Sequence, residues 1–257
     1  MPEGDTIHHA ANRIRPILTG EVPEIRTPHP RLKADRWPAR LSGRAVREVD
    51  AHGKHLFVHF DGDLLIHSHL RMTGSWGTYE QGQRWRRSPR RAWLVLSARD
   101  RDVVEFDGPV LELMTESRSR FDQRIAGLGP DICAAEFDED RFLRRLREED
   151  PTRPIGDALL QQQVVAGIGN MWKAEACFAA EVDPWRPAGR VSDEEALRIV
   201  RLLRPRMQES ALHGHQGLER AVYGREGRSC PRCGTAILQR GQWEDNRTTW
   251  WCPGCQR

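Results

Sequence analysis

Long apolar runs are missing from this sequence of 257 residues, and so is an apolar leader segment. No stretch approaches the roughly 18 to 20 apolar residues that a bilayer-spanning helix needs. A secretory signal is apolar in its centre, whereas the first thirteen residues carry Glu3 and Asp5. With 38% hydrophobic and 30% charged residues, the composition is typical of a globular protein. We therefore expect a cytoplasmic location and no membrane partner.

Lysine is scarce, because Lys33, Lys54 and Lys173 are the only three lysines among 40 basic residues. Much of this bias is what a GC-rich genome produces. Arginine nevertheless cannot replace lysine where a compact or titratable amine is needed. Each lysine is therefore either present by chance or a candidate for a role that arginine performs poorly. The net charge of +3 favours an acidic partner only weakly.

Cysteine is rare before the last 28 residues, where four of the six cysteines fall in two C-x-x-C pairs: Cys230, Cys233, Cys252 and Cys255. A cytosolic chain does not rely on disulfides, and two such pairs at this separation predict a zinc site. Four protein ligands leave no open position on the ion, so we expect one structural Zn²⁺. Cys133 and Cys177 are interpreted as small buried apolar residues.

The length favours two compact units, and the period of the apolar residues changes along the chain. The first unit is predicted to be a β-sandwich or barrel behind one helix at residues 5–18. Its short strands are predicted at residues 44–50, 55–61, 63–68, 92–98 and 102–107.

The second unit is predicted to be helical, with helices at residues 136–150, 155–165 and 170–181. A capping box of Ser192 and Glu195 opens a further helix, which we expect Pro205 to interrupt. Residues 236–251 predict a hairpin between the cysteine pairs. The fold class is therefore α+β, with domains predicted at residues 1–130, 131–224 and 225–257.

The start of the chain offers a candidate nucleophile. Methionine before a small residue is commonly removed, which would leave Pro2 with a free secondary amine. An α-amino group titrates near pH 8, so part of it is neutral near pH 7 and can form a Schiff base with an aldehyde. Glu3, directly beside it, could act as an acid or a base. Most N-termini have no such role.

Three segments could contact a polyanion. In the turn AGIGN, Gly167 and Gly169 allow a positive φ, and Asn170 begins a helix whose N–H groups could bind phosphate. The same turn could serve packing alone. Residues 220–257 hold seven arginines and three acidic residues, so Arg247 is either a phosphate ligand or a solvated side chain. The run RWRRSPRR at residues 84–91 holds five arginines and is either a contact to such a polyanion or a solvated loop.

Six segments in order resemble one family from end to end. They are MPEG at the start, GKHLF around Lys54, HLRMTG around Met72, AGIGNMWKAE around Asn170, VYGREG, and CPRCG with RTTWWCPGCQ at the end. The chain resembles the formamidopyrimidine-DNA glycosylase/endonuclease VIII family, and within it the endonuclease VIII branch of actinobacteria. The resemblance implies a β-sandwich, a helix-two-turns-helix domain and a zinc hairpin.

The resemblance also implies a reaction on damaged DNA, namely base excision and strand cleavage by β- and δ-elimination. Pro2 would attack C1′ of the damaged nucleotide, and Glu3 would protonate the sugar ring oxygen. Lys54 would contact phosphate and support β-elimination. Asn170 with Gly169 would hold phosphates beside the lesion. Arg247 would do the same from the zinc hairpin.

Other implied contacts lie near Met72. With Leu70 or Arg71, Met72 would fill the gap that a flipped-out nucleotide leaves. His69 would either face the DNA backbone or pack within the sheet. Glu175 would stabilise the helix-two-turns-helix unit. We expect a monomer that needs no small-molecule cofactor and is associated with the nucleoid through DNA.

Two departures from the formamidopyrimidine branch bear on the substrate. That branch usually has an acid at the sixth position, where this chain has Thr6, and it carries a further wedge loop that residues 106–114 lack. Both departures favour oxidised pyrimidines over oxidised purines. The alternatives are an oxidised-purine glycosylase and a non-catalytic binder of damaged DNA. The second would be favoured if Pro2, Glu3 or Lys54 were missing.

Overall fold

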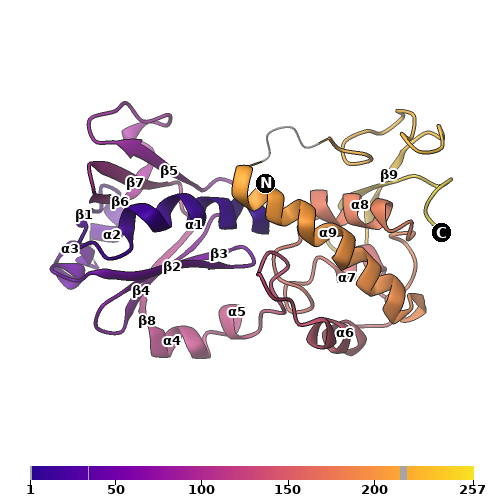
Figure 1. Cartoon of the computed structure of the whole chain (residues 1–257), viewed down its shortest axis with the longest axis horizontal. Helices are drawn as coiled ribbons and strands as arrows, with labels where there is room; N and C mark the ends of the chain where they lie inside the picture. The colour runs from indigo at the N-terminus through magenta and orange to yellow at the C-terminus, as the bar shows by residue number, and fades with distance from the viewer. Residues whose placement is uncertain (1, 34, 215–218) are drawn as a thin grey trace. The chain divides into compact units, whose positions relative to one another are not determined.

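The computed structural model describes residues 2–33, 35–214 and 219–257, which form two compact units (Figure 1). One unit contains Pro2 and residues 6–126, and the other contains residues 3–5 and 127–257. Met1, whose removal we expect, lies outside the described residues.

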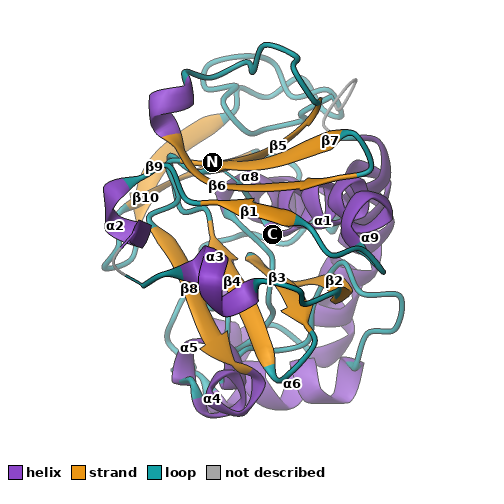
Figure 2. Cartoon of the chain, turned by 90° about the vertical axis from the view of Figure 1, so that its left-hand side faces the viewer, coloured by secondary structure: helices purple, strands orange, loops and turns teal. Residues whose placement is uncertain are grey.

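The first unit contains two antiparallel four-stranded sheets within its described residues (Figure 2). One sheet has the order β1-β6-β7-β5, with the bounds Glu24–Arg26, Ala92–Ala98, Arg101–Phe106 and Ser75–Glu80. The other has the order β2-β3-β4-β8, with the bounds Val46–His52, His55–Phe60, Leu64–His69 and Val110–Thr115. All five predicted strands are confirmed, whereas β1, β5 and β8 were not predicted.

The core of this unit is shared by helix α1 (Gly4–Leu18) and both sheets. Ile7, Ala11, Ile14 and Leu18 recur at helical spacing and are buried together with apolar residues of β2, β3, β6 and β7. Pro16 lies inside the helix without ending it. A short 3-10 helix (Pro89–Arg91) precedes β6, and the short α-helices are α2 (Pro30–Lys33), α3 (Trp37–Leu41), α4 (Glu116–Phe121) and α5 (Gln123–Ala126).

The second unit packs its helices around one apolar core, which includes Cys133 and Cys177 as expected. Its helices are α6 (Glu139–Glu148), α7 (Ile155–Ala158), α8 (Asn170–Ala179) and α9 (Asp193–His213), with a 3-10 turn at Ala188–Arg190. Ser192 and Glu195 form the predicted capping box. The expected interruption at Pro205 is wrong, because α9 continues through it with Leu203 and Met207 buried on either side.

The predicted helix at residues 155–165 is also wrong beyond Ala158, where two turns replace it. The Gln162 amide donates to the carbonyl oxygens of Leu160 and Ile168 and accepts the N–H of Gly167. These side-chain bonds give the backbone an alternative to the helix. The β-branched Val164 and Val165 lower helix propensity in the same segment.

The predicted terminal hairpin is confirmed. Strands β9 (Leu238–Gln242) and β10 (Arg247–Trp251) pair antiparallel, with Arg247 opposite Gln242. Trp243 and Asn246 adopt positive φ values in the connecting turn. Among the described helices, none combines the length and the apolar character that crossing a membrane requires.

Candidate nucleic-acid interface

Glu3 lies at the amino end of helix α8. Its carboxylate accepts backbone N–H bonds from Gly169 at 3.1 Å, Met171 at 2.9 Å and Trp172 at 3.3 Å, and the residue is only 4% exposed. The first N–H groups of a helix lack intrahelical partners and carry the positive end of its dipole, so a carboxylate is stabilising there. Glu3 therefore caps α8 and fixes the chain directly after Pro2. This capping role could not be predicted, because the two segments lie at opposite ends of the sequence.

The glycine turn before α8 makes this approach possible. A Cβ on Gly169 would lie 2.2 Å from the Glu3 Cδ, and a Cβ on Gly4 would lie 2.7 Å from the Gly167 Cα. The Gly4 N–H donates to the Gly167 carbonyl oxygen at 2.8 Å. Gly167 has the expected positive φ, but Gly169 has a φ of −120°, so its requirement is space rather than backbone conformation.

Asn170 and Arg247 are joined through the hairpin. The Asn170 Nδ2 donates to the Thr248 carbonyl oxygen at 2.8 Å, next to Arg247 at the start of β10. Arg247 is exposed, and its Nε lies 3.3 Å from the exposed Asp245 carboxylate, which is a weak pair in water. The structure therefore brings both predicted phosphate ligands together.

Lys173 lies one turn further along α8 and is completely buried. Its Nζ donates to the Thr249 Oγ1 at 2.6 Å and to the Gln242 Oε1 at 3.4 Å, so it connects the helix to both strands of the hairpin. Burial lowers its pKa to about 8. The scarcity of lysine predicted that this residue could have a role that arginine performs poorly. It did not predict that the residue lies under the hairpin.

Glu175 is buried on the same helix and anchors the segment before the cysteines. Its carboxylate accepts the backbone N–H groups of Ala221, Val222 and Tyr223 at 2.9 to 3.0 Å. The contact therefore goes to the segment that leads into the hairpin. Helix α8 therefore contacts Glu3 at its start, the hairpin through Lys173, and the segment before the cysteines through Glu175.

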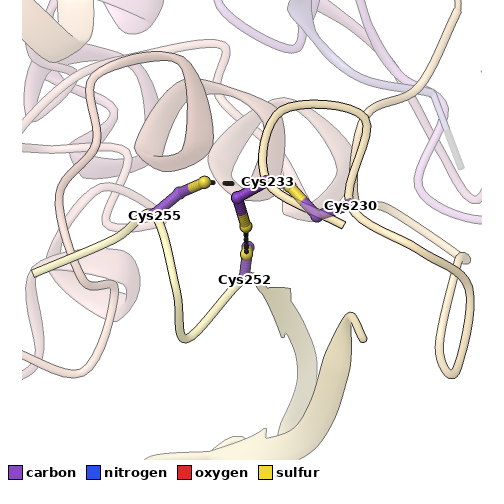
Figure 3. Close-up of side chains that lie close together, drawn as sticks. All are labelled: Cys230, Cys233, Cys252 and Cys255. Atoms are coloured by element: carbon purple, nitrogen blue, oxygen red, sulfur yellow. Dashed lines mark hydrogen bonds between the residues drawn. The ribbon is translucent and has the colours of Figure 1, made fainter. Parts of the chain in front are cut away.

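The four terminal cysteines converge as a potential metal site (Figure 3). Their sulfur atoms all lie within 4.8 Å of one another, with 3.8 Å between Cys230 and Cys255 and 3.5 Å between Cys233 and Cys252. A tetrahedral zinc site with Zn–S bonds of about 2.3 Å separates its sulfurs by about 3.8 Å. The donor set and its spacing therefore fit a structural zinc ion.

In the first unit, Lys54 and His69 lie near each other. Lys54 is half-buried in the two-residue turn between β2 and β3, and His69 ends β4. Burial, followed by the charges of Arg71, His67 and Lys54, lowers the pKa of His69 to about 4. The His69 Nδ1 accepts the backbone N–H of Arg71 at 3.2 Å, so the neutral ring carries its proton on Nε2.

The residues after His69 differ in exposure. Leu70 is 3% exposed and packs in the sheet core, which removes it from the surface. Arg71 is exposed with a φ of 45°, and Met72 is 70% exposed. A large apolar side chain held on a turn in this way is available to contact a ligand.

A buried histidine chain, which sequence reasoning missed, lies beside Lys54. The His55 Nδ1 and the His67 Nε2 are 2.8 Å apart, and the His67 Nδ1 is 3.4 Å from Glu112, which pairs with Arg124. Burial lowers the pKa of both rings, that of His55 to about 2, so both are neutral at pH 7. The only sequence signal for this cluster was the alternation of His67 and His69 on β4, which pairs with the strand that begins at His55.

Two family models match this chain. They are the formamidopyrimidine-DNA glycosylase N-terminal domain over residues 1–110 and the formamidopyrimidine-DNA glycosylase H2TH domain over residues 128–221. The probable endonuclease 8 2 of Streptomyces coelicolor is 39% identical over 269 residues, covering all of this chain and 94% of that protein. The chain belongs to the formamidopyrimidine-DNA glycosylase and endonuclease VIII family.

Other members of the family are also similar over full length. The DNA-(apurinic or apyrimidinic site) lyase Nei2 of Mycolicibacterium smegmatis is 35% identical and the formamidopyrimidine-DNA glycosylase of Thermus thermophilus is 33% identical, each covering all of this chain and at least 98% of the relative. Identity is thus higher to these actinobacterial proteins, in agreement with the predicted branch. The Lactococcus lactis Fpg, solved with DNA containing N7-benzyl-Fapy-dG, shares the fold at a TM-score of 0.84 and 23% identity over both whole chains.

Proposed function

We propose that the chain excises oxidised pyrimidines from DNA through a Schiff base on Pro2 and then cleaves the strand by β- and δ-elimination. Its family consists of DNA glycosylases and DNA-(apurinic or apyrimidinic site) lyases of base excision repair. The observation that carries the residue assignment is the anchoring of Glu3. Because Pro2 is bonded to Glu3, the same contacts restrain the proposed nucleophile.

In the first step, the Pro2 nitrogen forms a bond to C1′ while the bond from C1′ to the base breaks, and the proton that the Pro2 nitrogen loses leaves with the base. The Glu3 carboxylate first takes a proton from the Pro2 ammonium group and then donates it to the sugar ring oxygen, which opens the ring and leaves an iminium linkage. In β-elimination the C2′ proton leaves and the bond to the 3′ phosphate breaks. Lys54 contacts phosphate and supports this step.

The DNA backbone is held by groups that do not read sequence. The Arg247 guanidinium would donate to phosphate oxygens, Asn170 would add the amide N–H that its bond to Thr248 leaves over, and the neutral His69 would add its Nε2–H. One zinc ion on the four cysteines would hold the hairpin that presents Arg247. A ligated ion supplies much of the folding energy of so small a module.

The preference for pyrimidines rests on two features of the first unit. The connection between β7 and β8 spans only residues 107–109, which is too short to carry a second wedge loop. Position 6 is Thr6, where the formamidopyrimidine branch usually has an acid. The gap in the duplex would then be filled mainly by Met72, the exposed apolar side chain after β4.

A lesion panel with borohydride trapping tests the proposal. The protein is prepared without an N-terminal tag and mixed with duplexes carrying thymine glycol, 5-hydroxycytosine, dihydrouracil or 8-oxoguanine. We expect a trapped covalent complex with the pyrimidine lesions, weak trapping with 8-oxoguanine opposite cytosine, and none for Pro2→Gly. A retained Met1 should also abolish trapping.

Three results would contradict different parts of the proposal. Undiminished trapping by Pro2→Gly or by an N-terminally tagged protein would remove Pro2 as the nucleophile. Efficient excision of 8-oxoguanine only opposite cytosine would favour the oxidised-purine alternative. Binding of lesion DNA without any trapped product would favour a non-catalytic binder.

A further inference from the structure

The connection between β5 and β6 carries five arginines on an anchored loop, residues 83–91, which we call the arginine loop. Trp85 packs its ring against Phe106 at 5.8 Å and Tyr79 at 6.3 Å between centroids. Both partners are buried residues of the sheet, so the middle of the loop is fixed to the body of the unit.

Two of the five arginines form ion pairs with the same carboxylate, which offsets one of their two positive charges. The Arg87 Nη1 lies 2.6 Å from the Asp107 Oδ2, and the Arg91 Nε lies 2.8 Å from the Asp107 Oδ1. The neighbouring Glu105 is fully buried, and burial, followed by the charge of Asp107, raises its pKa to about 8. Glu105 is therefore mostly protonated at pH 7 and offsets little of the positive charge of the loop.

The other three arginines, Arg84, Arg86 and Arg90, are exposed. Within the described ranges, none of them forms an ion pair with a carboxylate. Residues 83–89 line a hollow of about 530 Å³, so Arg84 and Arg86 contribute to a concave surface. An anchored loop that carries three unpaired arginines attracts an anionic partner. The planar guanidinium groups of these arginines can donate paired N–H bonds to phosphate oxygens.

The arginine loop is fixed beside the turn that carries Met72. The Arg87 Nη1 also donates to the Thr73 carbonyl oxygen at 3.0 Å, and the Thr73 Oγ1 lies 3.4 Å from the Asp107 carbonyl oxygen. Arg87 and Asp107 thus connect the loop to the residue directly after Met72. DNA that places its displaced nucleotide at Met72 would meet the loop through neighbouring phosphates.

We propose that the arginine loop is a second DNA-backbone contact, in which Arg84, Arg86 and Arg90 bind phosphates beside the nucleotide that Met72 displaces. The inference rests on the proposed function, since it takes damaged DNA as the partner. In this proposal, phosphate contacts hold the duplex in place of a second wedge loop, for which the β7–β8 connection is too short. Such contacts hold the duplex without selecting the base opposite the lesion.

The test replaces all three arginines in one variant, Arg84→Gln/Arg86→Gln/Arg90→Gln. The affinity of each protein for a duplex that contains a tetrahydrofuran abasic analogue is then measured at salt concentrations from about 50 to about 300 mM. Each lost phosphate contact should lower the slope of log K against log salt by about 0.9, so we expect a decrease of about 2 to 3.

A matched control keeps the net charge change but moves it away from the loop. Arg40, Arg118 and Arg120 are also exposed in the first unit, so Arg40→Gln/Arg118→Gln/Arg120→Gln removes the same charge. The control should leave most of the salt slope in place. An unchanged slope in the loop variant, or an equal decrease in the control, would overturn the inference. Failure of the wild-type protein to be trapped would instead contradict the proposed function.

Discussion

At the scale of single residues, the decisive feature is the space that one missing side chain leaves. Glu3 reaches three N–H groups at the start of α8 only because Gly169 has no Cβ. Since the φ of Gly169 suits any residue, alanine there is excluded by the Glu3 carboxylate and not by backbone strain. A substitution at Gly169 therefore tests the steric effect of a side chain without adding backbone strain.

Gly169→Ala should therefore displace Glu3 and lower the yield of trapped complex with lesion DNA by about tenfold or more. A near-attack geometry tolerates little displacement, so a shift of about 1 Å can cost about 10²-fold in rate. Trapping kinetics under single turnover measure the loss, and zinc content should stay at the wild-type level. Wild-type kinetics in this variant would mean that the cap does not position the reacting groups.

At the scale of elements, the sheet β2-β3-β4-β8 carries a buried polar chain where an apolar layer would be usual. His55 is 8% exposed and His67 is 1% exposed, and burial lowers the pKa of both rings. The unfolded chain protonates these rings near pH 6.5, whereas the folded protein does so only at lower pH. Below pH 6.5 the unfolded state therefore binds more protons, and the free energy of unfolding falls as the pH drops.

His55→Gln should make this pH dependence shallower. Glutamine can still donate an amide N–H to His67 but does not titrate. The free energy of unfolding of the variant should therefore change less steeply with pH, by up to about 1.4 kcal/mol per pH unit between about pH 6.5 and 4.5. Urea unfolding of both proteins at several pH values gives the slopes. Carboxylates contribute equally to both proteins, so parallel curves would show that His55 is not the source.

The hairpin of β9 and β10, next to the four cysteines proposed to bind zinc, is the second element with a prediction of its own. Cys252→Ser should release the ion, disorder β9 and β10, and abolish lesion binding, because ligation stabilises the module. Arg247→Ala should keep the zinc and lower the salt slope by about 1, since only one phosphate contact is lost. Zinc analysis and binding titrations separate the two variants. Normal binding by zinc-free protein would remove the hairpin from the interface.

Much of the fold could be predicted from local sequence, because alternation and spacing report burial directly. The strands around Leu56 and Leu94 and the hairpin between the cysteine pairs follow from such patterns. Strand β5 was missed because Gly77 breaks its pattern, and the turns after Ala158 depend on the Gln162 side-chain bonds. The candidate site was predicted residue by residue through resemblance, whereas the contacts of Glu3 and Lys173 join distant segments that no local pattern links.

At the scale of the whole molecule, the proposed contacts describe an enzyme that would hold the DNA backbone firmly and the base opposite the lesion weakly. Met72 is the exposed apolar side chain on the turn after β4, and the connection after β7 is short. Opening a stacked base pair costs a few kcal/mol, part of which an inserted side chain offsets. An enzyme built in this way should accept a lesion opposite any base.

Met72→Ala should therefore slow base excision from duplex DNA much more than cleavage of a preformed abasic site. Only the first reaction must extrude a stacked base, so we expect a difference of about tenfold or more between the two effects. Single-turnover rates on matched duplexes, with each of the four bases opposite the lesion, provide the measurement. Equal slowing of both reactions would show that Met72 acts on the chemistry or the fold instead.

The exposure of Cys233 has a consequence for repair under oxidative stress. Of the four clustered cysteines, Cys233 is exposed while Cys230 and Cys252 are buried. Oxidation of a thiolate follows its accessibility, so peroxide should react first with the Cys233 sulfur and thereby release the zinc ion that we propose for this site. The oxidants that create the lesions would then disable the protein that removes them, and its DNA affinity should fall with released zinc while the Pro2 amine is still intact. Thiol reductants would restore repair capacity as long as oxidation had not passed the disulfide stage.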